Sequence, residues 1–377
     1  MTPFSMFLAL QPLFRESWGL SNTASGWISS AYFGGYMLAV PLLSSLTDRI
    51  DARRVWLAAC AMAGAGALGY ALCADGVWTA SLFQVIAGAG LAGTYMPGLK
   101  LLADRLPDTP RPRHVALYTT SFTIGSSLSF WVVGWLAGLM HWRSAIAVTA
   151  LGPGLAWLLI AVGLRPVAVA ATTVNGSKAH WTSVVRSADS MRYVAGYAAH
   201  VWELFALRAW LVPFVTFVAF ALGTASPVSP ATLAAIVALI GVPASIAGAE
   251  LIGRIPRRRL IVRVMLLSIA ASTIVAPASL VSWPIVIAAV CLYSAFISAD
   301  SAALTSGILD VAPPASRGTA MAMYSTLGFA AASAGTFAVG GLLDVLGGES
   351  TFSWTLAFIM MGAPNVVGAV VISRASR

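Results

Sequence analysis

The chain has 377 residues, of which 59% are apolar and only 9% are charged, and its mean hydropathy is +0.85. A soluble domain carries about 25% charged residues, so this composition excludes a soluble globular protein. The apolar runs are long and lack the alternating pattern of barrel strands, which leaves a bundle of membrane-spanning α-helices.

Twelve apolar runs predict twelve helices, six in each half of the chain. The first six cover about residues 1–14, 25–46, 55–74, 78–102, 115–140 and 144–164. The other six cover about residues 193–220, 231–252, 260–280, 284–308, 319–342 and 353–373. The first run is shorter than the ~20 residues that a spanning helix needs. We therefore expect either a natural start upstream of Met1 or a short stub of helix 1 beside helix 7.

The net charge of +9 is not spread evenly over the loops. Of the 22 Lys and Arg residues, 19 fall on one side of the predicted bundle, and the exceptions are Arg15, Arg143 and Arg208. Loops rich in Lys and Arg stay in the cytoplasm. The basic excess therefore indicates orientation and argues against nucleic-acid binding. We expect a multi-pass protein of the cytoplasmic (inner) cell membrane, with the central loop and the C-terminus in the cytoplasm.

An internal repeat divides the chain. Arg49–Arg54 recurs as Arg254–Arg259 at an offset of 205 residues, and further matches follow at an offset of 206. Agreement at the same place in each half is the signature of a duplication. A polar segment separates the two copies, an arrangement typical of transporters built from two parallel repeats. The predicted domains are the N-terminal six helices over 1–164, a cytoplasmic linker over 165–192, and the C-terminal six helices over 193–377.

The charged segment between helices 2 and 3 carries a motif. Asp48-Arg49 and Arg53-Arg54 resemble the Gly-x-x-x-Asp-Arg/Lys-x-Gly-Arg-Arg signature of the major facilitator superfamily (MFS) of secondary transporters, although Ser44 and Asp51-Ala52 stand in place of its glycines. The resemblance implies an all-α membrane protein with two six-helix bundles, related by a pseudo-two-fold axis around a central cavity. It also implies secondary active transport of a small solute by alternating access.

The resemblance further implies a gate at the cytoplasmic face. Asp48 ends helix 2, where its carboxylate is placed to cap the N-terminus of helix 11, which begins near Arg317. Such a contact would hold the two halves closed on the inside. The alternative is that these charges only anchor the topology. The gating candidates are Asp48, Arg49, Arg53, Arg54, Asp104 and Arg317.

Ionisable residues inside the helices mark the predicted site, because such residues are costly in lipid and usually face a cavity. In helix 7, His200, Glu203 and Arg208 share a face of about 140°, and helix 10 adds Asp300 and Ser301. By the family resemblance, helices 7 and 10 line the cavity. Glu203 and Asp300 would then face each other about 12–15 Å from the cytoplasmic end and form a proton-coupling pair.

Each of these residues also has a structural interpretation. Arg208 either forms an ion pair with one of the two carboxylates or meets an anionic substrate. His200 is either a coupling residue or a packed, hydrogen-bonded histidine. Softer candidates for the cavity wall are Thr94, Tyr95 and Gln11.

Other classes of function find less support in the sequence. His200 and Glu203 have no third metal ligand near them, so no metal site is predicted, and no cofactor motif is present. The HExxH pattern of metalloproteases is missing as well, so we do not expect an enzyme. The alternatives are a membrane-embedded enzyme of another kind or a sensor that does not transport. The expected partners are a small solute, protons and the lipid bilayer, with the protein as a monomer.

Overall fold

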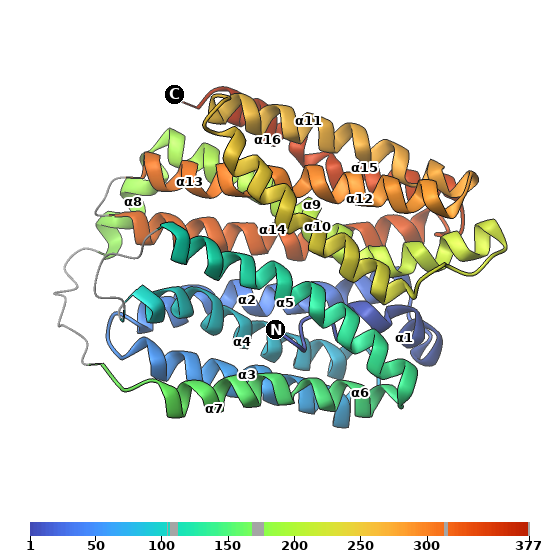
Figure 1. Cartoon of the computed structure of the whole chain (residues 1–377), viewed down its shortest axis with the longest axis horizontal. Coiled ribbons are helices and arrows are strands. Elements are labelled where there is room, and N and C mark those ends of the chain that lie inside the picture. Colours follow the sequence, from blue (N-terminus) through green and yellow to red (C-terminus); the bar gives the residue numbers. More distant parts are fainter. Residues whose placement is uncertain (104, 106–111, 168–176, 313–315, 376–377) are drawn as a thin grey trace.

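The computed structural model describes residues 1–103, 105, 112–167, 177–312 and 316–375, and these are almost entirely helical. Figure 1 shows the helices of the N-terminal half in blue to green below those of the C-terminal half in yellow to red. The N-terminal half contains η1 (Leu8–Leu10), α1 (Gln11–Trp18), α2 (Asn22–Leu46), α3 (Ala52–Cys73), α4 (Val77–Ala103), α5 (Pro112–Leu139), α6 (Trp142–Thr149) and α7 (Leu151–Gly163).

The remaining helices begin with α8 (Ser177–Arg186), which lies in the predicted linker. The C-terminal half contains α9 (Ala188–Leu222), α10 (Pro230–Leu251), α11 (Arg257–Val275), η2 (Pro277–Leu280), α12 (Trp283–Ala299), α13 (Ser301–Val311), α14 (Arg317–Val345), α15 (Thr351–Gly362) and α16 (Pro364–Ser373). The predicted all-α membrane fold is confirmed.

Ten helical stretches of the described chain are long and apolar enough to cross a membrane, compared with twelve predicted from the sequence. α1 has 8 residues and is too short to cross a membrane. α2 has 25 residues, but it carries many serines and glycines. It packs between α4 and α14, so its polar positions contact protein instead of lipid.

The predicted helix over residues 1–14 is wrong in its bounds. Residues 2–7 form turns, η1 follows, and α1 starts only at Gln11. Pro12 explains this start, because proline has no N–H to donate and is tolerated in the first turn of a helix. Figure 1 places the N-terminus between the two ends of the bundle.

Four predicted helices are each interrupted: α6 and α7, α11 and η2, α12 and α13, and α15 and α16 replace single helices. Pro153, Pro277 and Pro364 lie in the first turn after three of these breaks, where proline ends the preceding hydrogen-bond ladder. The fourth break falls at Asp300, without a proline. It brings two of the predicted site residues against α9, as described below.

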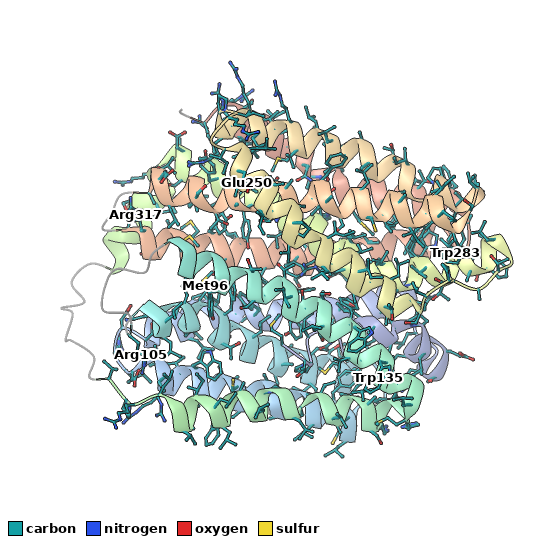
Figure 2. All side chains as sticks on the ribbon, viewed as in Figure 1. Met96, Arg105, Trp135, Glu250, Trp283 and Arg317 are labelled. Carbon is teal, nitrogen blue, oxygen red and sulfur yellow. The ribbon has the colours of Figure 1, made fainter. Side chains whose placement is uncertain are left out.

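The two ends of the bundle differ in composition. Figure 2 shows Arg105 and Arg317 at the end that carries α8, which we call the linker end. Trp135 and Trp283 lie at the opposite end, which we call the far end. Arginine gathered at one end agrees with the charge asymmetry found in the sequence.

The two halves of the chain meet along α2–α14 and α5–α10. The first contact is close because glycine faces backbone: a Cβ at Gly26 would lie 2.9 Å from the carbonyl oxygen of Thr336. Hydroxyl groups add cross-links, since Ser333 Oγ donates to the carbonyl of Ser30 (3.0 Å) and Ser127 Oγ donates to the carbonyl of Ala235 (2.7 Å).

A carboxylate closes this contact at the far end. The amides of Asn22 and Thr23, at the start of α2, donate to the two carboxylate oxygens of Asp344 near the end of α14, at 2.8 and 2.7 Å. Asp344 therefore caps a helix that belongs to the other half of the chain. The unpaired N–H groups and the dipole at a helix N-terminus both favour such an anion.

Asp344→Asn should loosen the far end, because the amide side chain lacks the charge and offers one acceptor oxygen where the carboxylate offers two. A cap of this kind contributes roughly 1 kcal/mol. We expect faster maleimide labelling of a single cysteine placed at Ser333, on the α2–α14 contact, in a protein whose three native cysteines are replaced.

Asp75→Asn is the matched control, since Asp75 is exposed and, among the described residues, its side chain accepts a hydrogen bond only from Thr79. Equal labelling rates for Asp344→Asn and the parent protein would show that the cap does not hold the far end closed.

Candidate functional site

The break between α12 and α13 forms the first part of the site. His200 on α9 lies with its Nδ1 2.8 Å from Oδ1 of Asp300, and its Nε2 is 3.2 Å from Oγ of Ser301. His200 and Asp300 are both almost completely buried. The structure thus brings these three predicted residues together, with both ring nitrogens of His200 engaged by the same break.

Aromatic rings fix the position of His200. Its ring stacks on Tyr197 at 5.9 Å between centroids, and Tyr197 stacks on Tyr324 of α14 at 3.6 Å. The hydroxyl of Tyr324 lies 3.1 Å from that of Thr305 on α13. The imidazole is therefore held on two sides, which favours a single orientation toward Asp300.

Glu203, one turn further along α9, has its own set of partners. Ser268 Oγ of α11 and Tyr293 Oη of α12 donate to Oε1 at 2.5 and 2.8 Å. Asn365 Nδ2 of α16 donates to Oε2. All three donors are uncharged, and Glu203 is 1% exposed. No cation is therefore among the hydrogen-bond partners of this buried carboxyl group in the described chain.

Among the described residues no hydrogen bond joins Glu203 to Asp300, which the sequence predicted to face each other, although their charges still interact. Asp300 turns to His200, while Glu203 points among α11, α12 and α16. The reason lies in the break at Asp300, which a continuous helix 10 would not contain. Two separate clusters, His200–Asp300–Ser301 and Glu203 with its three donors, replace the single pair.

Arg208 lies two turns beyond His200 on the same helix. It is 7% exposed, makes no ion pair with any described residue, and its Nε and Nη1 have no hydrogen-bond partner there. The structural ion pair with Glu203 or Asp300 considered above is not formed. Its guanidinium carbon lies 5.4 Å from the centre of the Phe205 ring.

The softer candidates lie in the N-terminal half. Thr94 and Tyr95 line a cavity of about 200 Å³, together with Met1, Phe4, Tyr32 and Phe122 among others. Thr94 Oγ1 donates to the carbonyl of Leu91 in its own helix. Gln11 is fully buried, and neither atom of its amide has a partner among the described residues.

The gating candidates are spread over the linker end. Asp48, Arg49, Arg54 and Arg317 are exposed, and the Asp48 carboxylate has no hydrogen-bond or ion-pair partner among the described residues. The expected cap on α14 is therefore not formed in this structure. Asp104 lies outside the described residues.

Arg53 binds backbone at the end of another helix. Its Nη2 donates to the carbonyl of Ala161 at 2.7 Å, at the C-terminus of α7. Arg258, 205 residues further on, donates through Nη1 to the carbonyl of Ala375 just after α16 (2.9 Å). Each arginine thus neutralises the negative end of the last helix of its half. The repeat found in the sequence is visible in these two contacts.

Asp51 is a residue that the sequence analysis treated only as a departure from the motif. Its carboxylate accepts hydrogen bonds from the amides of Arg53 (2.9 Å) and Val167 (3.0 Å) and from Nη2 of Arg105 (3.3 Å). Burial acts to raise the pKa of Asp51, but these hydrogen bonds outweigh it and leave that pKa lowered. Asp51 therefore ties α3, α4 and the chain after α7 together at the linker end.

Comparison with known proteins points to one family. The family model of the Major Facilitator Superfamily matches residues 1–336. The gallate transporter of Pseudomonas putida is 29% identical over 157 residues, which are 40% of this chain and 34% of that protein. The niacin transporter NiaP of Acinetobacter baylyi is 26% identical over 125 residues, 33% of this chain and 26% of that protein. The matched part thus spans about a third or less of these relatives.

Solved structures show the same fold over the whole chain. A bacterial homologue of the human lysosomal transporter Spinster, inward-facing and occupied, superposes with a TM-score of 0.76 at 15% identity, covering 100% of this chain and 94% of that one. A mutant of the nucleoside transporter NupG gives a TM-score of 0.75 at 15% identity, with coverages of 100% and 97%. With the sequence motif, the helical architecture and the family match in agreement, the chain belongs to the Major Facilitator Superfamily of transporters.

Proposed function

We propose that this protein is a secondary active transporter that moves a small solute by alternating access and is driven by protons. The observation that carries the proposal is the set of buried ionisable groups on adjacent helices of a transporter fold: His200, Glu203 and Asp300, each no more than 3% exposed. Such groups are costly at membrane depth and are retained where they serve a pathway for substrate or protons.

The two clusters suggest how a proton enters the cycle. Glu203 has neutral donors only, so it can hold a proton without a countercharge. The pair of neutral His200 and ionised Asp300 carries one negative charge, and it becomes a net-neutral ion pair when His200 takes up a proton. Both clusters join α9 to other helices, so a change of protonation alters the packing of α9. That packing change couples the proton to the movement of the halves.

The relatives suggest the class of solute. Gallate and niacin, after which the two curated relatives are named, are both small aromatic carboxylic acids. Aromatic monocarboxylates are therefore the solutes that we propose for this chain.

The charge distribution supports an orientation. Arginine gathered at the linker end supports, by the positive-inside rule, a cytoplasmic position of that end. We propose a multi-pass protein of the cytoplasmic membrane that acts as a monomer. The halves 1–164 and 193–377 would move relative to each other across the 165–192 linker. Asp48 would then cap α14 in the state in which the linker end is closed, opposite in sense to the Asp344 cap seen here.

Transport in proteoliposomes tests this proposal. Purified protein is reconstituted, and uptake of radiolabelled nicotinate and gallate is followed with and without a pH gradient, alongside a pH-sensitive dye that reports proton movement. We expect accumulation that needs the gradient and proton flux that needs the solute. If neither nicotinate, gallate nor any solute in a wider panel is transported, a sensor that does not transport would be favoured.

A further inference from the structure

Arg208 lies near the contact between the two halves of the chain and has no counterion among the described residues. A cavity of about 10 Å³, the space for one water molecule, lies beside its side chain. Phe130 of α5, Ala234 and Val237 of α10, and Ser294 of α12 line that cavity. Because α5 and α10 form one of the two contacts between the halves, the guanidinium faces the surface at which they separate.

The neighbouring polar groups are already engaged. The Ser294 hydroxyl donates to the carbonyl of Val237 at 2.7 Å, and Ser127 donates to Ala235 on the same α5–α10 contact. Glu203, the carboxylate nearest in sequence, is held by Ser268, Tyr293 and Asn365. No described group near Arg208 therefore supplies the negative charge that a buried guanidinium requires.

A cluster of phenylalanines adjoins the guanidinium. Phe205 lies under Arg208, and its ring contacts Phe33 at 4.6 Å, Phe329 at 5.3 Å and Phe4 at 6.3 Å between centroids. These rings come from both halves of the chain. Phe4 also lines the larger cavity of about 200 Å³. The positive charge of Arg208 thus lies beside a cluster of aromatic rings that extends to this larger cavity.

We infer that Arg208 and the phenylalanine cluster around Phe205 form the binding site for the solute, with the guanidinium taking a carboxylate and the cluster taking an aromatic ring. A carboxylate suits a guanidinium because it accepts charge-assisted hydrogen bonds, and Arg208 has buried N–H groups on Nε and Nη1 that no described residue accepts. In the conformation described here the halves are packed over the site, and the solute enters when they part.

This inference rests on the proposed function and adds the atoms that recognise the solute. It predicts that the protein binds ligands with both a carboxylate and an aromatic ring more tightly than ligands with only one of these groups. A ligand needs both the charge and the ring: a neutral amide of the same shape lacks the anion, and acetate lacks the ring. Nicotinate, nicotinamide and acetate form a set that separates these two requirements.

Binding of radiolabelled nicotinate to the purified protein tests the site, with unlabelled nicotinamide and acetate as competitors. We expect nicotinamide to bind about 10-fold or more weakly than nicotinate, because it forfeits a hydrogen-bonded charge pair. Arg208→Gln should abolish that difference, and Arg208→Lys should keep part of it, since lysine retains the charge but not the planar pair of donors. Phe205→Leu should weaken nicotinate and nicotinamide by the same factor.

Arg263→Gln is the matched control, because Arg263 is an exposed arginine on α11, and it should leave the preference unchanged. A folded Arg208→Gln protein that still prefers nicotinate would overturn the assignment of the carboxylate. If Arg208→Gln does not fold, Arg208→Lys with an unchanged preference overturns it equally. Acetate competing as well as nicotinate would overturn the role of the ring. Wild-type protein that binds neither but accumulates another solute would reject this site while leaving transport intact.

Discussion

Replacing Glu203 with glutamine is expected to abolish uphill transport driven by a pH gradient while leaving exchange of solute down its own gradient. Glutamine keeps the size of the side chain and an acceptor for Ser268 and Tyr293, but it cannot take or release a proton. Solute concentrations inside and outside proteoliposomes should become equal, and proton movement should no longer accompany the solute. Parallel recording of solute flux and proton flux measures both effects.

Glu250→Gln serves as the control. Glu250 is an exposed carboxylate near the linker end of α10, where Figure 2 labels it. Its loss should leave accumulation at the wild-type level. A Glu203→Gln protein that still concentrates the solute against its gradient would place coupling elsewhere, with the His200–Asp300 cluster as the next position to examine.

Gly88→Ala is expected to lower the stability of the protein substantially. α2 and α4 cross with glycine on both sides, and a Cβ at Gly88 would overlap the carbonyl oxygen of Tyr32, while one at Gly35 would overlap that of Val85. Both obstacles are backbone, which cannot rotate away. Overpacking of this kind costs about 1–3 kcal/mol. The Tm of the purified protein should fall, and Gly88→Val should yield little folded protein.

Gly64→Ala is the comparison for this substitution. A Cβ at Gly64 of α3 would meet its nearest neighbour, Pro153, at an ordinary 3.7 Å. Alanine favours helix over glycine by up to 1 kcal/mol, so this variant should be neutral or slightly more stable. If the two variants unfold at the same temperature, the α2–α4 crossing tolerates separation and the packing argument fails.

Much of the fold could be predicted because lipid leaves few solutions for an apolar chain. Long apolar runs fix the helices, and the repeat at 205 residues fixes the division into halves. Two residues at equivalent positions of the repeat, Arg53 and Arg258, make equivalent contacts, since each binds the carbonyl end of the last helix in its half. Three helix breaks were also encoded locally, because each falls just before a proline, namely Pro153, Pro277 or Pro364.

The partners of the site residues could not be predicted in the same way. Glu203 is bound by Asn365, which lies 162 residues away, and nothing in either segment specifies that contact. The break at Asp300 has no proline to announce it, yet it decides that Asp300 faces His200. Asp51 was passed over because it departs from the family motif. Such contacts depend on how helices pack, and hydrophobic periodicity carries no information about them.

The cap that Asp344 places on α2 has a consequence for how the chain tolerates change. Two of its donors are main-chain amides, which every residue except proline supplies at position 23, and the Thr23 side chain adds a further hydrogen bond. The acceptor is the Asp344 carboxylate, whose short side chain sets the distance to both amides. In a library randomised at positions 23 and 344 and selected for transport, position 23 should accept nearly every residue except proline, whereas position 344 should return aspartate.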